Sequence, residues 1–330
     1  MKRMLSGIKP TGQLTIGNYL GAIKHFLEYQ DEYELYIFVA NMHAVTVPNE
    51  RQELRKNSRD VAALFLASGL DPKRVTLFMQ TDVLEHANLA FILNCHTYMG
   101  ELARMTQYKD KMQKEKKGNH NVGLFTYPTL MAADILLYDS DYVPVGEDQK
   151  QHVELTRDIA QRFNNRFGAT FTVPKPLIAE FGARIMSLSN PDKKMSKSEE
   201  DDDKGCIYLL DEPKVARKKI MSAVTDSETS IHYDPLNKPG ISNLLTIMSC
   251  LENKSIPDLE KQFASANYGE FKKAVADAVE VFLKNLQANY QQIMESKILD
   301  QVLDEGATRA QSVARKTLSR VYKRLGLNRK

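Results

Sequence analysis

The alternation of short apolar runs with amphipathic segments most constrains how this chain can fold. Runs at residues 3–8, Glu34–Ala40 and Val75–Gln80 have the length and residue types of buried strands. Between them, apolar residues recur at helical spacing from Gly17 to Leu27, and again across residues 51–69 up to Gly69. This strand–helix–strand–helix–strand order predicts an α/β fold with a doubly wound, Rossmann-like parallel sheet.

The alternation continues to about residue 199 and then gives way to helices alone. An apolar helical stretch, Leu130–Tyr138, leads to a strand at Tyr142–Val145 and a helix at Asp148–Phe163, with Asp148 as its N-cap. The acidic run Glu199–Asp203 is typical of a hinge or an exposed loop. Helical periodicity then dominates at Lys214–Val224, Ser242–Leu251, Ile256–Ala264, Gly269–Met294 and Ala307–Leu325. We therefore expect a C-terminal all-helical domain.

Composition excludes several classes of protein. With 45 Lys and Arg against 42 Asp and Glu among 330 residues, the net charge of +3 excludes a wholly cationic nucleic-acid binder. The 3 cysteines form no CxxC pair, which favours a reducing, cytosolic setting. No apolar run approaches the roughly 18 residues of a membrane helix, and the start of the chain does not resemble a signal peptide. The chain contains no Trp, so any indole fluorescence must come from a bound ligand.

Two lysine- and arginine-rich segments each allow two interpretations. Lys109–Gly118, which is followed by the polar residues Asn119, His120 and Asn121, is either a mobile functional loop or a solvated linker. Gly306–Lys330 holds eight Lys and Arg and no acidic residue. Its helix either meets nucleic-acid phosphates or only keeps the protein soluble.

Two motifs indicate nucleotide chemistry. In Gly7–Asn18, a strand enters a glycine-bearing turn that opens a helix, an arrangement that favours phosphate, and Gly17 lets a ligand approach the backbone. Neither a P-loop nor GxGxxG occurs here, which weighs against a nicotinamide dehydrogenase. In Lys193–Ser198, lysines and hydroxyls in one loop can grip a polyphosphate, although a generic charged loop would look similar.

Together these motifs resemble those of class I aminoacyl-tRNA synthetases. Lys-Met-Ser-Lys-Ser at 194–198 matches the second signature (KMSKS) of that class in full, and Thr-Ile-Gly-Asn at 15–18 stands where the first signature has His-Ile-Gly-His. Further segments resemble bacterial tryptophanyl-tRNA synthetases in detail, at 7–22, 100–107, 131–138, 145–152, 182–188 and 239–245. The chain departs from the class at Thr15 and Asn18. It also departs at Lys9, where many members have Gln and where some auxiliary or inhibitor-resistant forms differ.

The resemblance implies a ligase of protein biosynthesis. Such an enzyme would activate L-tryptophan with ATP to tryptophanyl-AMP and transfer it to tRNA(Trp), with Mg²⁺ held through the ATP phosphates and no metal held by the protein. It would be a cytoplasmic homodimer. The implied domains are a catalytic one at 1–204, with an inserted helical segment at about 47–122, and an anticodon-binding one at 205–330. The C-terminal helix would pack back on the catalytic domain.

The resemblance also assigns site residues. Those expected to stabilise the pyrophosphate in the transition state are Lys194, Lys197, Ser196, Ser198 and Lys111. Those expected to bind ATP are Lys9, Pro10, Thr11, Thr15, Gly17, Asn18, Gly146, Glu147, Asp148, Gln149, Ile185, Lys194, Met195, Ser196, Lys197 and Ser198. Those expected to bind tryptophan are Asp134, Tyr127, Met131, Gly7, His43, Val143, Val145 and Gln149. By residue chemistry alone, Glu147 and Asp148 could instead be helix N-caps, and His43 a core histidine.

Asp134 is the residue whose chemistry is most informative. It lies in an otherwise apolar helical stretch, so its carboxylate needs a hydrogen-bond donor. An indole N–H suits it, a tyrosine hydroxyl suits it equally, and an internal salt bridge or helix cap is the alternative without a ligand. The related tyrosine enzyme therefore stays open from chemistry alone. A non-catalytic synthetase-like regulator and a plain nucleotidyltransferase are the remaining alternatives.

Overall fold

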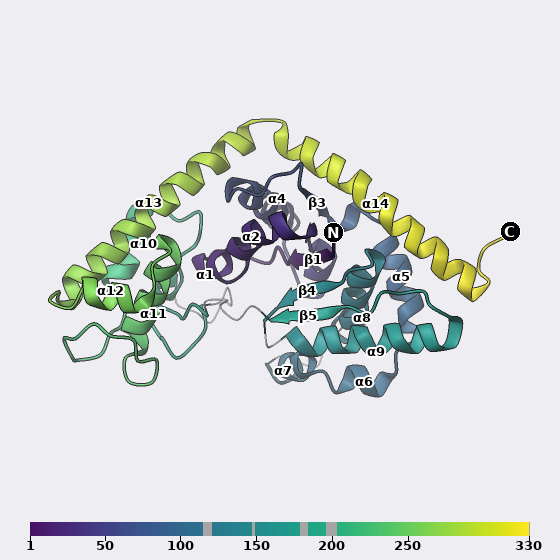
Figure 1. The fold of residues 1–330 in the computed structure, drawn as a ribbon, viewed down its shortest axis with the longest axis horizontal. Helices are drawn as coiled ribbons and strands as arrows, with labels where there is room; N and C mark the ends of the chain where they lie inside the picture. Colours follow the sequence, from purple (N-terminus) through teal and green to yellow (C-terminus); the bar gives the residue numbers. More distant parts are fainter. Residues whose placement is uncertain (115–120, 147–148, 179–183, 196–202, 330) are drawn as a thin grey trace.

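A five-stranded parallel sheet forms the centre of the N-terminal part of the chain (Figure 1). The computed structural model describes residues 1–114, 121–146, 149–178, 184–195 and 203–329. The strands follow the order β3-β2-β1-β4-β5, which is that of a doubly wound fold. Their bounds are Arg3–Ile8 for β1, Glu34–Val39 for β2, Val75–Met79 for β3, Tyr142–Val145 for β4 and Lys175–Ile178 for β5.

Helices cover both faces of this sheet and make up the regular structure beyond residue 203 in the part of the chain described. The α/β part contains α1 (Ile16–Asn18), a π-helical turn (Tyr19–Ile23), α2 (Lys24–Glu32), α3 (Asn41–Ala44), α4 (Arg51–Ala67), η2 (Gln80–Asp82), α5 (Glu85–Asn94), α6 (Met99–Ala103), α7 (Thr106–Lys114), α8 (Val122–Leu137) and α9 (Lys150–Phe167). The C-terminal part contains η4 (Asp203–Gly205), α10 (Pro213–Met221), α11 (Pro239–Glu252), α12 (Ile256–Gln262), α13 (Tyr268–Glu295) and α14 (Ile298–Leu325). The predicted α/β fold with a C-terminal helical part is confirmed.

Some predicted segments differ from the observed ones. Lys109–Gly118 was expected to be a loop, which is wrong for its first part, because α7 runs to Lys114. The helix predicted from Asp148 begins at Lys150 with Gln149 as its N-cap, and Asp148 itself lies outside the described residues. The acidic run also lies outside them, except for Asp203. Among the described elements, α5 and β5 have no counterpart in the sequence prediction, and neither have the short helices α3 and α6.

The strands β2 and β3 are buried on both faces of the sheet, as expected for parallel strands between helical layers, whereas the edge strand β5 is partly exposed. Along β2, Leu35, Ile37 and Val39 join the hydrophobic core under α2 and α4. Tyr36 and Phe38 point to the other face, into the core formed with α5, α8 and α9. The near-continuous apolar run of this strand is the physical reason that the sequence predicted it correctly.

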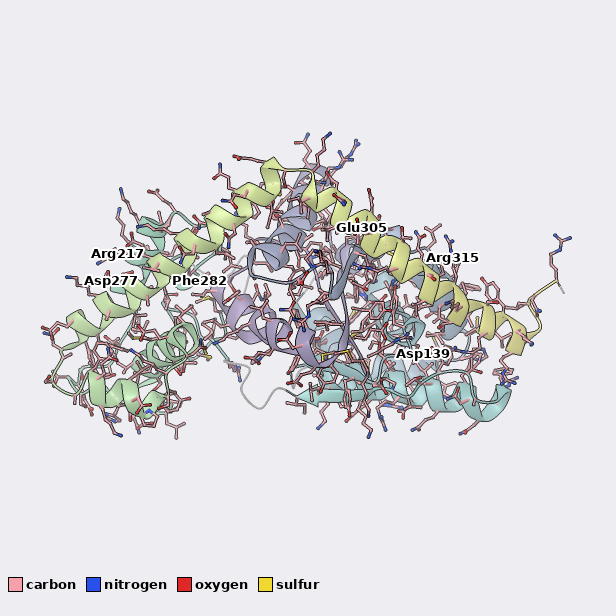
Figure 2. The ribbon with its side chains drawn as sticks, turned by 45° about the horizontal axis from the view of Figure 1, so that its top comes forward. Asp139, Arg217, Asp277, Phe282, Glu305 and Arg315 are labelled. Carbon is pink, nitrogen blue, oxygen red and sulfur yellow. The ribbon has the colours of Figure 1, made fainter. Side chains whose placement is uncertain are left out.

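The two long helices α13 and α14 meet at an angle and form an arch over the molecule (Figure 1). On one limb, Arg217 of α10 pairs with Asp277 and Glu280 of α13 (Figure 2). On the other limb, α14 returns to the α/β part, where Arg315 pairs with Glu85 at 3.1 Å and Arg320 pairs with Asp139 at 2.6 Å.

The basic C-terminal segment, Gly306–Lys330, thus has a structural role besides the nucleic-acid binding or solubility considered from its charge. Besides the two ion pairs, Arg309 donates to the carbonyls of Pro72 and Val75, and Arg324 donates to the carbonyl of Ala169. Four of its arginines therefore attach α14 to the α/β part. In the described parts of the chain, no helix is both long and apolar enough to cross a bilayer.

Gly306 marks the closest approach of α14 to the sheet. A Cβ atom at this position would overlap the backbone of Leu77 in the edge strand β3, first at its carbonyl oxygen. Only a glycine lets the helix axis come this close, and the helix in turn covers an edge that would otherwise be open to pairing.

Gly306→Ala tests this contact, because helix propensity and backbone overlap predict opposite changes in the stability of the protein. Helix propensity alone predicts that the substitution stabilises the protein by about 1 kcal/mol. Overlap with the Leu77 backbone predicts a loss of about 1–3 kcal/mol instead. We expect the loss, measured as a lower urea midpoint, whereas Ser312→Ala on the exposed face of α14 should be neutral or slightly stabilising. A stabilised Gly306→Ala would contradict the close packing.

Candidate active site

A cavity of about 210 Å³ lies at the carboxyl ends of β1 and β4 and is closed by α3 and α8. In parallel α/β sheets, ligands bind at this edge. The volume lies below the about 300–1,000 Å³ of pockets for drug-sized ligands, so it suits one small molecule. The cavity lining includes all eight residues assigned to the tryptophan subsite, namely Gly7, His43, Tyr127, Met131, Asp134, Val143, Val145 and Gln149.

Asp134 is the polar centre of this cavity. Its side chain is 1% exposed, and its two oxygens have three donors from the protein. Oδ1 accepts from Gln80 Nε2 at 2.8 Å and lies 2.6 Å from His86 Nδ1. Oδ2 lies 2.8 Å from His43 Nε2. The internal pairing considered for Asp134 is therefore present, together with its position at the cavity.

These partners keep the Asp134 carboxyl group ionised. Burial alone would raise its pKa, but the charge of His43 and hydrogen bonds from His43 and His86 lower the pKa to about 2. An ionised carboxylate accepts only, so both imidazoles donate to it. A carboxylate has about four acceptor positions. Oδ1 uses two and Oδ2 uses one, which leaves one acceptor position of Asp134 without a donor among the described residues.

The partners Gln80 and His86 were not identified from the sequence. Gln80 directly follows β3, a position that could have indicated a polar residue at the ligand edge. His86 lies within α5, is fully buried, and its Nε2 lies 2.8 Å from the hydroxyl of Tyr138. Burial raises the pKa of Tyr138 well above its usual value, so this hydroxyl stays protonated and donates to His86. No local pattern distinguishes His86, because its partners are distant in sequence.

The rest of the cavity wall combines apolar and polar side chains. Met131 of α8 and Val143 and Val145 of β4 supply apolar surface. The Tyr127 hydroxyl lies 2.8 Å from His152 Nε2, and burial raises the pKa of Tyr127 to about 12. Lys9, expected at the ATP subsite, also lines this cavity, and its Nζ donates to Thr46 Oγ1 at 3.3 Å.

The first signature motif forms a compact turn at the start of α1. Thr15 caps α1: its Oγ1 accepts from the Asn18 amide, and the Asn18 side chain accepts from the Thr15 amide at 3.0 Å. The two residues that replace the signature histidines therefore bond to each other. A Cβ at Gly17 would lie 3.5 Å from the Cβ of Ile185 and 3.7 Å from that of Met195, which are ordinary contact distances, so the two signature motifs lie against each other at this point.

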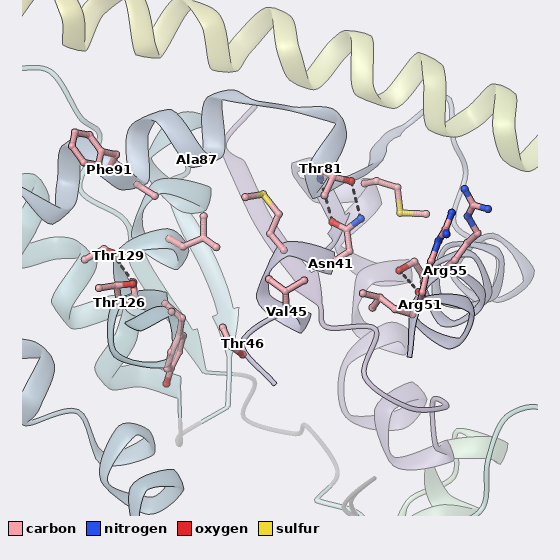
Figure 3. A pocket seen from close by; sticks show the side chains of 18 of the residues that line it. Asn41, Val45, Thr46, Arg51, Arg55, Thr81, Ala87, Phe91, Thr126 and Thr129 are labelled. Carbon is pink, nitrogen blue, oxygen red and sulfur yellow. Dashed lines mark hydrogen bonds between the residues drawn. The ribbon is translucent and has the colours of Figure 1, made fainter. Parts of the chain in front are cut away.

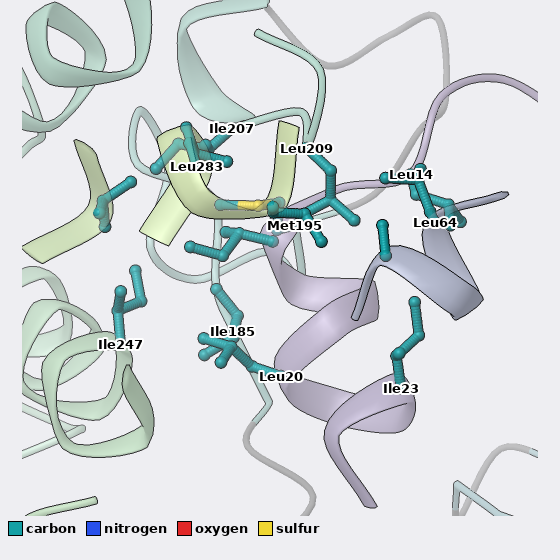
Figure 4. Close-up of a cluster of buried hydrophobic side chains, with 14 of the residues drawn as sticks. Leu14, Leu20, Ile23, Leu64, Ile185, Met195, Ile207, Leu209, Ile247 and Leu283 are labelled. Carbon is teal, nitrogen blue, oxygen red and sulfur yellow. The ribbon is translucent and has the colours of Figure 1, made fainter. Parts of the chain in front are cut away.

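The second signature motif is described only in part. Lys194 is exposed and Met195 is 3% exposed, packed with Ile185 and Leu20 in a cluster that Figure 4 shows. Several assigned residues lie outside the described residues, namely Ser196, Lys197, Ser198, Glu147 and Asp148. Lys111 belongs to α7, and its side chain is not described. The remaining assigned residues are exposed at Gly146 and Gln149, intermediate at Thr11 and buried at Pro10.

A second and larger cavity of about 940 Å³ adjoins the first (Figure 3). Thr46 and Tyr127 line both cavities and form part of the wall between them. The larger one opens among α3, α4, α5 and α8, and it exposes the apolar side chains of Val45 and Phe91, which are 67% and 71% accessible.

Comparison with known proteins agrees with this geometry. A family model described as tRNA synthetases class I (W and Y) matches residues 1–284. A tryptophan–tRNA ligase of Caldanaerobacter subterraneus is 54% identical over 327 residues, 99% of each chain. The tryptophanyl-tRNA synthetase structure from Mycoplasma pneumoniae superposes with a TM-score of 0.91 at 40% identity, covering 99% of this chain and 98% of that one.

A structure of the Campylobacter jejuni tryptophanyl-tRNA synthetase, described as complexed with ADP and tryptophan, is also similar. It superposes with a TM-score of 0.83 at 37% identity and covers 98% of this chain and 99% of its own. The matches extend over nearly the whole chain and include both signature motifs. The chain therefore belongs to the class I tRNA synthetase family of the tryptophan and tyrosine enzymes, as its motifs predicted.

Proposed function

We propose that the chain is a tryptophan–tRNA ligase that forms tryptophanyl-AMP from L-tryptophan and ATP and transfers the amino acid to tRNA(Trp). The observation that carries this proposal is the small apolar cavity around Asp134, with one acceptor position left on a carboxylate that stays ionised. An indole N–H donates only and fits that position. Full-length similarity to tryptophan–tRNA ligases supports tryptophan rather than tyrosine as the substrate.

In this proposal, the amino-acid carboxylate attacks the α-phosphate of ATP and pyrophosphate leaves. The reaction needs in-line positioning and charge neutralisation rather than a covalent nucleophile. Lys194 with the neighbouring Ser196, Lys197 and Ser198, and Lys111 from α7, would neutralise the departing pyrophosphate. Mg²⁺, bound through the ATP phosphates, would share that charge. The adjacency of Gly17, Ile185 and Met195 supports one nucleotide site formed by both motifs.

The partners follow from the same proposal. The helical part, at about 205–330, would bind the anticodon of tRNA(Trp), with 1–204 as the catalytic domain. Two copies of the chain would form a homodimer, covering the apolar surface around Val45 and Phe91, since exposed apolar patches of this kind mark interfaces. The three cysteines, none of them disulfide-bonded, support a cytoplasmic location.

Amino-acid-dependent exchange of pyrophosphate into ATP tests the activity directly. We expect exchange with tryptophan and little with tyrosine or phenylalanine, because the indole N–H would pair with Asp134 in this small cavity and the chain resembles tryptophan–tRNA ligases over its full length. Tyrosine-driven exchange would replace the proposal with the tyrosine enzyme. No exchange with any amino acid would favour the non-catalytic regulator.

Asp134→Asn tests the role assigned to the buried carboxylate. Loss of a hydrogen bond to a charged acceptor should raise the KM for tryptophan roughly 10- to 100-fold. The KM for ATP should change little. The matched control is Asp60→Asn, which alters another buried carboxylate, 5% exposed, in α4 and away from the cavity. Equal effects of Asp134→Asn on both substrates, or a similar tryptophan effect in the control, would make the role structural.

Phe91→Asp tests the proposed homodimer. Placing a charge on an apolar interface should shift the protein to monomers in sedimentation or light-scattering measurements, because the charge would be buried without a partner. Leu236→Asp is the control, since Leu236 is 91% exposed but lies in the C-terminal part, away from this surface. A dimer that survives Phe91→Asp, or an unaltered protein that is already monomeric, would contradict the assignment.

A further inference from the structure

Residues 185–195, which lead into the lysine motif, fold as a short antiparallel pair. Met186 lies opposite Lys194. The amide of Met195 donates to the carbonyl of Ile185 at 2.9 Å, and the amide of Ser187 donates to the carbonyl of Lys193 at 2.8 Å. This pairing fixes the exposed Lys194 one position away from the Met195–Ile185 contact, and Ile185 is the buried residue assigned to the adenine.

In such a pair, the backbone groups of successive residues face opposite sides. Since Ile185 and Ser187 bond to the 193–195 strand, both the N–H and the C=O of Met186 face away from it. They face α11 of the helical part, where the Asn243 side chain bonds to both: Oδ1 accepts from the Met186 amide at 2.8 Å, and Nδ2 donates to the Met186 carbonyl at 2.8 Å. The Asn243 carboxamide therefore takes the place of a third strand.

Asn243 is well placed to hold this segment rigidly. It is 4% exposed, and Ile247, one turn further along α11, belongs to the same buried cluster as Ile185 and Met195 (Figure 4). Because Asn243 is buried, water cannot easily take the place of its carboxamide. Removal of the carboxamide therefore leaves the Met186 amide and carbonyl without partners. By contrast, neither Asn243 nor any residue of 185–195 lines the cavity around Asp134.

We propose that Asn243 is a positioning residue for adenylate formation: through Met186 it fixes the backbone of Ile185 and the register of Lys194 against the first signature turn. This inference rests on the proposed function. It makes the helical part a structural component of the nucleotide site, because Asn243, which holds the outer side of the 185–195 pair, belongs to α11. Tryptophan binding in the absence of ATP does not depend on Asn243.

Asn243→Ala and Asn243→Asp test the proposal by steady-state pyrophosphate exchange. Alanine removes both hydrogen bonds, whereas aspartate keeps the acceptor for the Met186 amide and sets an oxygen against the Met186 carbonyl. In each variant we expect kcat/KM for ATP to fall by about tenfold or more, the equivalent of one buried group left unpaired. The KM for tryptophan should stay within about twofold, because the Asp134 cavity is unchanged.

Two further measurements separate positioning from general destabilisation. Binding of tryptophan alone is followed by its own fluorescence, since the chain contains no Trp, and both Asn243 variants should bind it as the unaltered protein does. The matched control, Asn164→Ala in α9, removes a carboxamide that also bonds to both backbone groups of one residue, the Phe171 amide at 2.9 Å and carbonyl at 2.8 Å, and should leave the ATP parameters unchanged.

The outcomes distinguish a failure of the positioning role of Asn243 from a failure of the proposed function. If the unaltered chain exchanges pyrophosphate with tryptophan but Asn243→Ala has the same ATP parameters, the positioning role is overturned and the proposed function stands. If Asn243→Ala loses tryptophan binding as well, Asn243 only stabilises the fold and the positioning role is again overturned. If the unaltered chain shows no exchange, the proposed function itself fails, and the positioning role with it.

Discussion

The buried carboxylate of Asp134 is the constraint on which the architecture of the cavity depends. An unpaired carboxylate in this environment would be costly, so the fold must bring donors to it. They come from three segments separate from α8, which carries Asp134: His43 in α3, Gln80 after β3 and His86 in α5. Satisfying one charge therefore fixes how four segments meet at the carboxyl edge of the sheet, and that meeting defines the cavity.

The two signature motifs illustrate how polar and small residues divide their roles. Thr15 and Asn18 have the hydrogen-bonding capacity expected of a nucleotide site, yet they use much of it on each other to close the turn. Gly17 lies within contact distance of Ile185 and Met195, which pack against the turn. Shape at this site thus comes from buried contacts, while the exposed cation Lys194 remains available to a charged ligand.

The sequence predicted the elements whose signal is local. The apolar run of β2 and the periodicity of α13 needed only neighbouring residues, and the eight cavity residues were assigned by motif resemblance. It missed β5, a four-residue strand that contains Pro176, and α5, whose buried residues lack a clear stripe. It also missed His86, because its role depends on partners brought together only by tertiary packing. The acceptors of the α14 arginines were not identified for the same reason, since they lie more than 150 positions away.

Discrimination among aromatic substrates must then come from two different sources. Phenylalanine has no donor, so it would leave the last acceptor position of Asp134 unpaired, and hydrogen bonding alone rejects it. Tyrosine has a hydroxyl that can donate, so hydrogen bonding does not reject it. Because Gln80 and His86 hold Oδ1 in place, the carboxylate cannot move along the cavity to accept a hydrogen bond from a donor placed elsewhere in it. Under the proposed function, selection of indole over phenol would therefore depend on the distance between this fixed carboxylate and the apolar side chains of Met131, Val143 and Val145.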